Sequence, residues 1–475
     1  MHSLDRRRFL KRTGALATAA ALAPLATQER ETMAQRSTEA PRKRPNVLIL
    51  FSDDQRFDTI HALGNEHIIT PNLDALVRGG VAFTHAHIMG SMQGAVCVPS
   101  RAMLLTGRTL FRCQPLEEGM TFPEVFRADG YTTFATGKWH NGAPAFARGF
   151  SAGADIFMGG MNDHWRTPVH DFDPTGKYPK ESRRTGEAFS SELFSNAAIK
   201  FLREYDGDDP FLMYVSYTAP HDPRIAPQKY ADMYDPDEIP LPPNFMPEHP
   251  FDNGEMKIRD EKLAPWPRTP EIVRQHLADY YAMITHMDEH IGHVLAALHQ
   301  TGRADDTIVV FAGDNGLAVG QHGLLGKQNL YEHSVRVPLV VCGPGIPEGR
   351  RSRALVYLYD IFPTICELTG VAAPDTVEGE SLVPLIKRRK RRLRDSVFAA
   401  YKDIQRMVRD ERYKLIEYRV NGTRTTQLFD VANDPWELSN LSADPKHGKR
   451  LAQLREEMTR WQRDVGDPAV DEWPR

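Results

Sequence analysis

The chain has 475 residues and a formal net charge of −4, from 59 basic and 63 acidic side chains. This near balance gives no reason to expect binding to nucleic acid or to an anionic membrane surface. A composition of 41% hydrophobic and 26% charged residues is typical of globular proteins, and the length predicts about two to three domains with enough chain to bury a core.

The first 34 residues have the pattern of an export signal. A basic stretch, 6–11, precedes the uncharged, Ala-rich stretch 13–28. The paired arginines followed by Phe9-Leu10-Lys11 resemble a Tat signal, an address that the Tat export machinery reads. We therefore expect residues 1–34 to be a cleaved signal and its tail, 35–44 to be a linker, and the protein to be periplasmic or secreted. A basic N-terminal helix of a cytosolic protein is the alternative.

Apolar runs alternate with helical patterns from residue 45 to residue 386. This alternation predicts an α/β domain with a large, mostly parallel sheet sandwiched by helices, interrupted by surface loops over 142–183 and 225–270. No segment after the signal is long and apolar enough to anchor the protein stably in a membrane. We expect strands over 47–51, 81–83, 131–135, 211–215, 307–311 and 337–341, and helices over 70–77, 124–130, 190–205 and 271–300.

The composition changes near residue 387, where a run of six basic residues begins. A solvated linker over 387–395 is favoured over a nucleic-acid patch, because no aromatic residue is interleaved. Beyond it, we expect a smaller α+β domain, 396–475, with an antiparallel sheet and a final helix. Its predicted strands are 396–400, 407–409, 413–418 and 426–430, and its predicted helix is 445–465.

Polar side chains follow four of the predicted strands. Because parallel strands present their carboxyl ends at one edge of an α/β sheet, these side chains can converge on one crevice. They are Asp53 and Asp54, Lys138 and His140, His221, and Asp314 and Asn315.

Three carboxylates and one amide oxygen within this set suit a hard divalent cation, Ca²⁺ or Mg²⁺. Adjacent carboxylates such as Asp53 and Asp54 are costly unless a cation neutralises them. Each pair alone is equally explained by turn chemistry, since Asp, Asn and Gly are common in turns. The two pairs together favour a metal site, with Asp314 and Asn315 as the second pair.

The stretch from Cys97 to Arg108 places a thiol at a predicted helix start, with Pro99 in the first turn and Gly107 as the stop. A helix N-terminus stabilises an anion, so Cys97 could be a reactive cysteine of low pKa. A buried structural cysteine is the alternative. The other cysteines, Cys113, Cys342 and Cys366, form no C-x-x-C pair, and we expect neither a zinc site nor an essential disulfide.

The string C-x-P-S-R-x-x-x-L-T-G-R that begins at Cys97 resembles the signature of the type I sulfatases, members of the alkaline phosphatase superfamily, and the resemblance extends over about 45–441. It implies an alkaline phosphatase-like fold and an arylsulfatase-like sulfuric ester hydrolase. In this family a formylglycine-generating enzyme oxidises the cysteine to formylglycine (3-oxoalanine), whose hydrate is the nucleophile. The resemblance also implies a bound Ca²⁺ or Mg²⁺, held by Asp53, Asp54, Asp314, Asn315 and residue 97.

The resemblance assigns roles to the remaining polar residues. Lys138, in Gly137-Lys138-Trp139-His140, would contact the nucleophile and the sulfate, and His140 would abstract a proton. The other implied roles are sulfate binding and proton donation for His221, a second sulfate-binding cation for Lys327 and orientation of the nucleophile for Arg101. The i,i+4 spacing of Glu332 and Arg336 predicts a structural ion pair.

The substrate itself is the least constrained expectation. The two predicted surface loops should wall the pocket, and their polar and aromatic residues suit a sugar. Export and the lack of a lipid-binding stretch favour a sulfated carbohydrate, or another sulfated small molecule, over a steroid or lipid. Candidate substrate contacts are His164, Trp165, Arg224 and His322.

Three alternatives stay open at this point. One is a phosphonate monoester or phosphodiester hydrolase of the same superfamily, and another is a non-catalytic sulfated-glycan binding protein with an unmodified Cys97. A thiolate-dependent phosphatase is disfavoured, because only Val98, Pro99 and Ser100 separate Cys97 from Arg101, too few for a C-x₅-R loop.

Overall fold

The computed structural model of the chain describes residues 44–116 and 119–473. The predicted signal, 1–34, and residues 35–43 of the predicted linker lie outside this range. Among the described residues, no helix has both the length and the apolar character needed to cross a bilayer.

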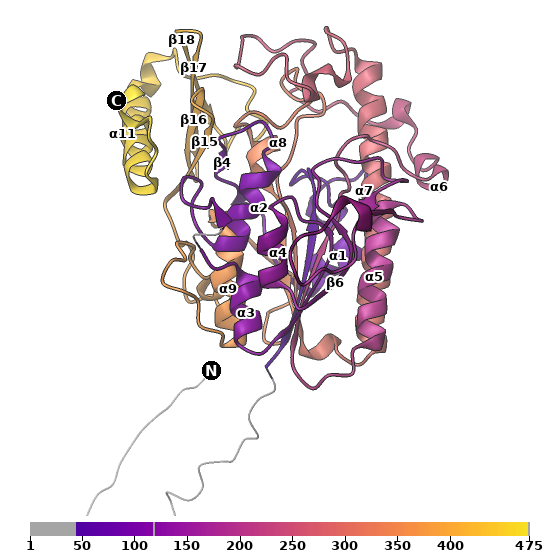
Figure 1. Cartoon of the computed structure of the whole chain (residues 1–475). Coiled ribbons are helices and arrows are strands. Elements are labelled where there is room, and N and C mark those ends of the chain that lie inside the picture. The colour runs from indigo at the N-terminus through magenta and orange to yellow at the C-terminus, as the bar shows by residue number, and fades with distance from the viewer. Residues whose placement is uncertain (1–43, 117–118, 474–475) are drawn as a thin grey trace, which may run out of the picture. The chain divides into compact units, whose positions relative to one another are not determined.

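A large sheet forms the centre of the structure (Figure 1). Neighbouring strands are parallel except around β12, which runs antiparallel to both β10 and β2. The predicted mostly parallel α/β sheet is therefore confirmed. Its order is β13 (Arg350–Ser352), β2 (Gly80–Phe83), β12 (Leu339–Cys342), β10 (Thr307–Gly313), β1 (Asn46–Ser52), β9 (Phe211–Ser216), β5 (Thr132–Lys138) and β6 (Ala152–Phe157).

Helices cover both faces of this sheet (Figure 1). Met283 and Ile291 of the long helix α7 belong to the same buried cluster as Leu48 of β1, and this cluster forms the core on one face. Val47 and Ile49 of β1 point the other way, into the larger core cluster. One face carries α1 (Pro71–Gly79), α5 (Ser190–Glu204) and α7 (Pro270–Gln300); the other carries α2 (Cys97–Thr106), α3 (Phe122–Ala128), α4 (Ala143–Gly149) and α9 (Ile361–Thr369).

The expected surface loop over 142–183 is wrong in its first part. It contains α4 and then β6, which pairs parallel with β5 and forms one edge of the sheet. Only the second half of β6 is buried, so its sequence lacks the continuous apolar run of a central strand. The rest of the segment holds β7 (Pro168–Val169), η3 (Lys180–Ser182) and, beyond it, β8 (Arg184–Thr185). The expected loop over 225–270 contains only α6 (Gln228–Ala231), η4 (Pro236–Glu238) and η5 (Asp260–Leu263).

A smaller sheet near the C-terminus confirms the predicted antiparallel domain. Its order is β18 (Thr423–Asp430), β17 (Tyr413–Val420), β16 (Gln405–Asp410), β15 (Ser396–Tyr401) and β4 (Gly90–Ser91), with α11 (Gly448–Val465) packed beside it. The strand β4 comes from the N-terminal half and pairs with β15. Gly90 has φ +86°, and a Cβ there would lie 2.0 Å from the carbonyl oxygen of Ala400, so the approach requires glycine.

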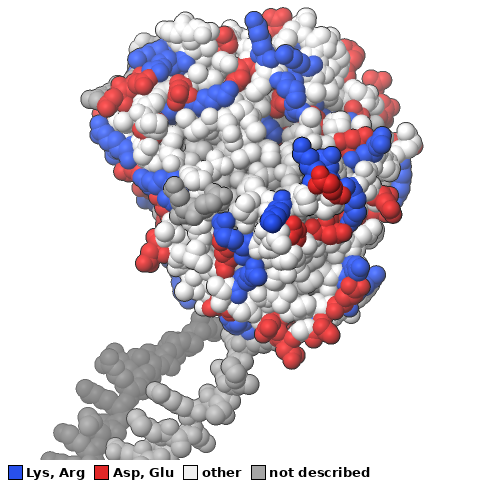
Figure 2. Space-filling model, in the orientation of Figure 1, with Lys and Arg blue, Asp and Glu red and all other residues white. Residues whose placement is uncertain are grey.

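The two sheets share one buried hydrophobic cluster, which contains Val47 and Leu105 as well as Phe398 and Met407. The domain boundaries at 386 and 395 therefore stay predictions. The described chain also contains a three-stranded sheet and two further short helices. The sheet consists of β11 (Arg336–Val337), β3 (Ala86–His87) and β14 (Val356–Tyr357), and the helices are α8 (Glu332–Val335) and α10 (Val383–Ile386). On the face that Figure 2 shows, basic and acidic side chains are interspersed, in keeping with the near balance of charge.

Candidate active site

Four neighbouring strands carry the predicted polar residues to one edge of the central sheet. These strands are β10, β1, β9 and β5, which lie next to one another in this order. Asp53 directly follows β1, Asp314 directly follows β10, Lys138 is the last residue of β5, and His221 lies in the loop after β9. The parallel alignment brings side chains from distant parts of the sequence together, as expected at the carboxyl edge of such a sheet.

The acidic residues contact one another directly. The Asp54 backbone N–H donates to Asp314 Oδ1 at 2.9 Å, and Asn315 Nδ2 donates to Asp54 Oδ1 at 2.7 Å. Ligand atoms of Asp53, Cys97 and Asp314 all lie within 4.8 Å of one another. All these residues are buried, and two of their oxygens, Asp53 Oδ1 and Asn315 Oδ1, have no hydrogen-bond partner within the described chain.

Unpartnered buried oxygens are costly, and a hard cation would satisfy them. The set of three carboxylates and one amide oxygen therefore fits Ca²⁺ or Mg²⁺ and does not discriminate between them. Burial raises the pKa of Asp314 to about 7, and the adjacent Asp53 carboxylate adds to this shift. A bound cation would reverse it by stabilising the ionised form.

Three cations surround the carboxylates. Arg101 Nε donates to Asp314 Oδ2 at 2.9 Å, and its Nη1 donates to the Lys138 carbonyl oxygen at 3.0 Å. Lys138 Nζ donates to Asp53, and Lys327 Nζ contacts both Asp54 oxygens, at 2.6 and 2.9 Å. Burial alone would raise the pKa of Asp54, but Lys327, His221 and Lys138 together outweigh it and hold that pKa well below its ordinary value. These three cations balance the charge of the carboxylates but donate no hydrogen bond to Asp53 Oδ1 or Asn315 Oδ1.

Cys97 is the first residue of α2, so the helix begins two residues before Pro99. Its Sγ lies 3.3 Å from His140 Nδ1 and 3.7 Å from Lys138 Nζ. The expectation of a thiol with low pKa is wrong here, because burial raises the pKa of Cys97 despite the nearby Lys138 and Lys327 ammonium groups.

His140 sits above Cys97 in a left-handed backbone conformation, φ +60°. Its pKa is lowered to about 2, by burial first and then by Lys138 and Arg101, so the ring is neutral near pH 7 and keeps a free lone pair. A Cβ at Gly160 would lie 2.5 Å from the His140 ring, so a larger residue there would displace that ring.

His221 approaches the carboxylates from the loop after β9. Its Nε2 is 3.6 Å from Asp54 Oδ2, and its Nδ1 is 2.8 Å from the Asp222 carbonyl oxygen. Burial lowers the pKa of His221 to about 4, although Asp54 favours the protonated ring. Asp54, His221 and Asp222 also have ligand atoms within 4.8 Å of one another.

A cavity of about 340 Å³ opens directly onto these groups. Cys97 therefore faces a cavity and does not point into apolar packing. Its lining residues are Gly94, Ala95, Cys97, His140, Gly160, Met161, His221, Ile258, Arg259, Asp260, Lys327 and Gln328.

No sequence pattern pointed to Arg259, which lines this cavity from a Pro-rich insertion. Its guanidinium makes two bonds to Asp222, at 2.7 and 2.8 Å, and also contacts Asp260. Gln328 Nε2 in turn donates to Asp260 Oδ2 at 2.8 Å. Arg259, Asp260 and Gln328 form a polar wall of the cavity, and the first two lie in a segment with neither a strand nor a recognised motif.

The four expected substrate contacts do not line this cavity, and two of them require correction. His164 is buried, with its Nε2 2.9 Å from the His221 carbonyl oxygen and its Nδ1 2.7 Å from Ser190 Oγ, so it supports His221 instead. His322 is stacked on Tyr331, and its Nε2 lies 3.1 Å from the Glu437 carbonyl oxygen.

The other two expected contacts lie elsewhere. Trp165 is half exposed, with its ring against Phe189. Arg224 Nη1 lies 3.1 Å from His276 Nδ1. Neither residue faces the catalytic groups around Cys97.

Comparison with known proteins gives two family matches. Residues 45–371 match the family model described as Sulfatase, and residues 320–464 match the one described as N-sulphoglucosamine sulphohydrolase, C-terminal. Together the matched regions contain every predicted catalytic and metal-binding residue.

Individual relatives can be aligned with this sequence over most of its length. An ulvan-active sulfatase of Formosa agariphila is 30% identical, over 87% of this chain and 82% of the relative. An N-acetylglucosamine-6-O-sulfatase of Bacteroides thetaiotaomicron is 25% identical, over 90% of this chain and 88% of the relative. A solved structure in complex with its substrate D-glucosamine-2-N,6-O-disulfate has the same fold, with a TM-score of 0.77 at 23% identity, covering 91% of this chain and 100% of that one.

Proposed function

This chain belongs to the sulfatase family and is a sulfuric ester hydrolase, and on that premise we propose that it cleaves a sulfate monoester of a carbohydrate to the alcohol and inorganic sulfate. The reaction takes place at a formylglycine made from Cys97 by a formylglycine-generating enzyme, beside a bound Ca²⁺ or Mg²⁺. The observation that carries this proposal is the contact of Cys97 Sγ with both His140 and Lys138, at the edge where two carboxylate-site oxygens stay unpartnered.

When bound, the cation held by Asp53, Asp54, Asp314 and Asn315 would supply positive charge to the sulfate and to the hydroxyl that attacks sulfur. The protein's own residues do the rest. Lys327 places one ammonium group at the cavity, and Lys138 places another 3.7 Å from Cys97 Sγ. Both bind the sulfate oxygens and stabilise the charge that these oxygens carry.

Proton transfer is assigned to the two histidines and one lysine that line the cavity. The neutral His140 ring accepts a proton from the residue at position 97, because its Nδ1 is already at 3.3 Å from that side chain. Lys327 and His221 are the groups that can deliver a proton to the departing alcohol. Arg101 holds the catalytic groups in position, since it donates hydrogen bonds both to Asp314 and to Lys138, the last residue of β5.

The choice of a carbohydrate rests on the relatives and on the cavity wall. Both relatives named above act, by their names, on sulfated sugars or a sulfated polysaccharide. Arg259, Asp260 and Gln328 offer donors and acceptors of the kind that bind sugar hydroxyls.

Three measurements on the purified protein test the proposal. The peptide containing residue 97 should show an aldehyde in place of the thiol by mass spectrometry. A panel of sulfated mono- and disaccharides should release inorganic sulfate faster than a matched phosphodiester is cleaved. Treatment with EDTA should abolish turnover, and Ca²⁺ or Mg²⁺ should restore it. Unmodified Cys97 in fully active enzyme would refute the formylglycine mechanism.

We also propose that the Tat machinery exports the protein to the periplasm or the medium. The support is the Arg6-Arg7 pair before Phe9-Leu10-Lys11, in the part of the chain that the structure does not describe. The Arg6→Lys/Arg7→Lys variant should leave the precursor in the cytoplasm, as cell fractionation would detect. Equal export of both forms would contradict the proposal.

A further inference from the structure

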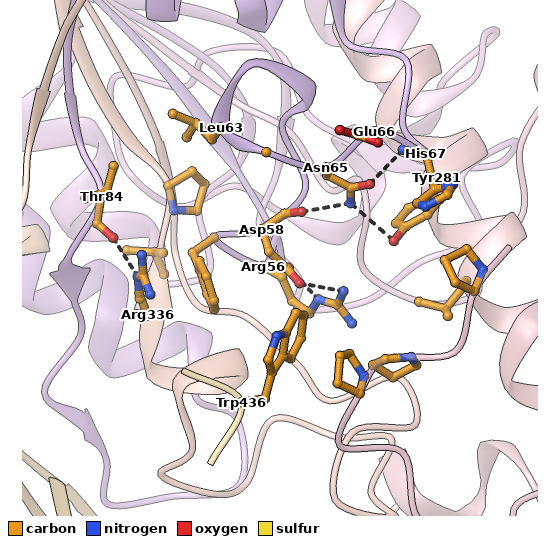
Figure 3. A pocket seen from close by; sticks show the side chains of 18 of the residues that line it. Arg56, Asp58, Leu63, Asn65, Glu66, His67, Thr84, Tyr281, Arg336 and Trp436 are labelled. Carbon is orange, nitrogen blue, oxygen red and sulfur yellow. Dashed lines mark hydrogen bonds and ion pairs between the residues drawn. The ribbon is translucent and has the colours of Figure 1, made fainter. Parts of the chain in front are cut away.

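Two adjoining cavities lie apart from the catalytic one and share no lining residue with it. The first, here named the aromatic cavity, has about 440 Å³ and is drawn in Figure 3. The second, named the arginine cavity, has about 480 Å³. Thr84 and Arg336 line both, and the neighbours Pro435 and Trp436 line one each, so the two cavities form one continuous site.

The arginine cavity has a large excess of positive charge. Four arginines line it, and Glu332 is the single acidic residue among its described lining residues. Glu332 is shared among three cations: it pairs with Arg409, lies 3.8 Å from Arg336 Nη1 and lies 3.1 Å from Lys414 Nζ. The four arginines are Arg336, Arg351, Arg353 and Arg409.

Two of these arginines have no carboxylate partner in the described structure. Arg351 donates only to the backbone carbonyl oxygen of Ala62, and no hydrogen bond or ion pair is formed by Arg353 with any described residue. The pKa of His85, in the same cavity, is lowered to about 2, by burial first and then by Arg336 and Arg409. Clustered like charges of this kind are unfavourable unless an anion occupies the space between them.

The aromatic cavity offers flat apolar surface next to this charge. Trp436, Phe57 and Tyr281 line it, together with Pro240, Pro242, Pro243 and Pro338. Figure 3 places Arg336 and Thr84 at one end, Tyr281 and His67 at the other, and Trp436 between them. Arg336 lies over the Phe57 ring at 3.9 Å, and the Arg56–Asp58 pair supplies polar atoms inside the cavity. Aromatic faces beside donors and acceptors suit a sugar ring.

We propose that the two cavities form a second binding site for a sulfated saccharide, with a sulfate group between Arg351 and Arg353 and a sugar ring against Trp436. Arginine matches the geometry of an oxyanion through paired N–H donors. The anionic character of the ligand follows from the arginines alone; the choice of a saccharide rests on the proposed function. Such a site would hold a polymeric substrate on the enzyme while the catalytic cavity acts on another part of it.

Isothermal titration calorimetry with dextran sulfate at fixed salt tests this site. Arg351→Gln/Arg353→Gln should weaken binding by about tenfold, since it removes the two guanidinium groups that have no carboxylate partner among the described residues. The matched control is Arg389→Gln/Arg391→Gln, which removes the same charge from the exposed basic run and should change Kd by less than about twofold. Trp436→Ala should also weaken binding, and unsulfated dextran should not bind.

Other outcomes would overturn the proposal. An equal loss in both arginine double variants would show non-specific attraction to net charge, and no loss in Arg351→Gln/Arg353→Gln would remove the site. Carboxymethyl dextran that bound as tightly as dextran sulfate would refute the assignment to sulfate.

Turnover separates this proposal from the function proposed above. The kcat of Arg351→Gln/Arg353→Gln on nitrophenyl sulfate should equal that of the wild type, because neither residue lines the catalytic cavity. A wild type that bound dextran sulfate through these arginines without cleaving any sulfate ester would contradict the proposed function and leave the second site intact.

Discussion

The proposed mechanism requires, at position 97, a side chain that carries two hydroxyl groups once it is modified, and the contacts of Cys97 fit that chemistry. The thiol is 2% exposed and lies between the His140 ring and the Lys138 ammonium group. Burial raises its pKa, so the unmodified group is a poor nucleophile, whereas a neutral hydroxyl would meet a base at the same place.

Cys97→Ser should therefore abolish turnover, with kcat on an aryl sulfate reduced by about 10³-fold or more. Serine has one hydroxyl and lacks the second, which is needed to release sulfate. Cys113→Ser is the matched control, because Cys113 is equally buried but does not line the cavity. Sulfate release measures both, and a Cys97→Ser variant with near-normal kcat would exclude the proposed mechanism.

His164 provides a second prediction at this scale, as a positioning residue. It bonds to the His221 carbonyl oxygen and to Ser190, so His164→Phe frees the loop that carries His221. We expect kcat to fall by about 10- to 100-fold with little change in KM, since small displacements of catalytic groups are costly. The neighbouring Trp165→Phe is the control and should leave both constants unchanged. A rise in KM at unchanged kcat would instead point to direct substrate binding by His164.

Among the elements, the central strands could be predicted because their burial is complete. Every residue of β1, β9 and β10 is buried, so each reads as a continuous apolar run. The edge strand β6 is buried only in its second half and begins Ala152-Gly153-Ala154, which has no strand pattern. Its place in the sheet is set by pairing with β5 and not by its own sequence.

The contrast between buried strands and less regular segments also explains which residues of the active site could be predicted. Asp53, Asp314 and Lys138 could be located because each lies at the end of a buried parallel strand, where the topology fixes its position. Arg259 and His322 lie in irregular segments, whose side-chain directions depend on tertiary packing. Sequence patterns therefore predicted the charge-bearing centre and failed for the surrounding wall.

Asp288 links two elements and allows a prediction about pH. It lies on α7 and accepts hydrogen bonds from the backbone N–H groups of Asn72 and Leu73 at the start of α1, at 3.1 and 2.7 Å. Burial raises its pKa from 3.8 to about 6, although these donors oppose the shift. As pH rises, the unfolded chain loses this proton first, near pH 3.8, and the folded chain loses it only near pH 6. The protonated Asp288 therefore contributes stability that is complete below pH 3.8 and is lost as pH rises through about 6.

Asp288→Asn cannot titrate and also leaves donors at α1 unsatisfied. The variant should be less stable than the wild type and unfold at a lower temperature. The difference in the free energy of unfolding should be greatest near pH 4 and shrink by roughly 3 kcal/mol or less towards pH 7.5. Calorimetric unfolding across this pH range measures it. Asp305→Asn, an exposed change in the turn that follows the same helix, is the control. A deficit that widened with pH would show that the ionised carboxylate is the favoured form.

Over the whole molecule, the C-terminal sheet contacts the segment that carries Lys327. Glu332, five residues further on, pairs with Arg409 of β16 and Lys414 of β17. Lys414 Nζ also lies 2.7 Å from Glu437 Oε1, so one ammonium group serves two buried carboxylates. The small sheet therefore helps to fix a loop of the catalytic cavity, which explains why both sheets share one core.

Lys414→Met should reveal this dependence, because Glu437 loses its ammonium partner, whereas Glu332 keeps the guanidinium groups of Arg409 and, at 3.8 Å, Arg336. Losing one partner of a buried ion pair costs about 3 to 5 kcal/mol, so the unfolding temperature should fall. The control is Arg406→Met. Arg406 lies in the same sheet and forms an equally buried pair with Asp467, at 2.6 Å, which this variant breaks without touching the Lys327 segment.

Both variants should be destabilised to a similar extent, but only Lys414→Met should lower kcat/KM at a temperature where both remain folded. Equal activity losses would mean that the C-terminal sheet acts on the active site only through global stability, and unchanged activity in Lys414→Met would show that the Lys327 loop keeps its position without this support.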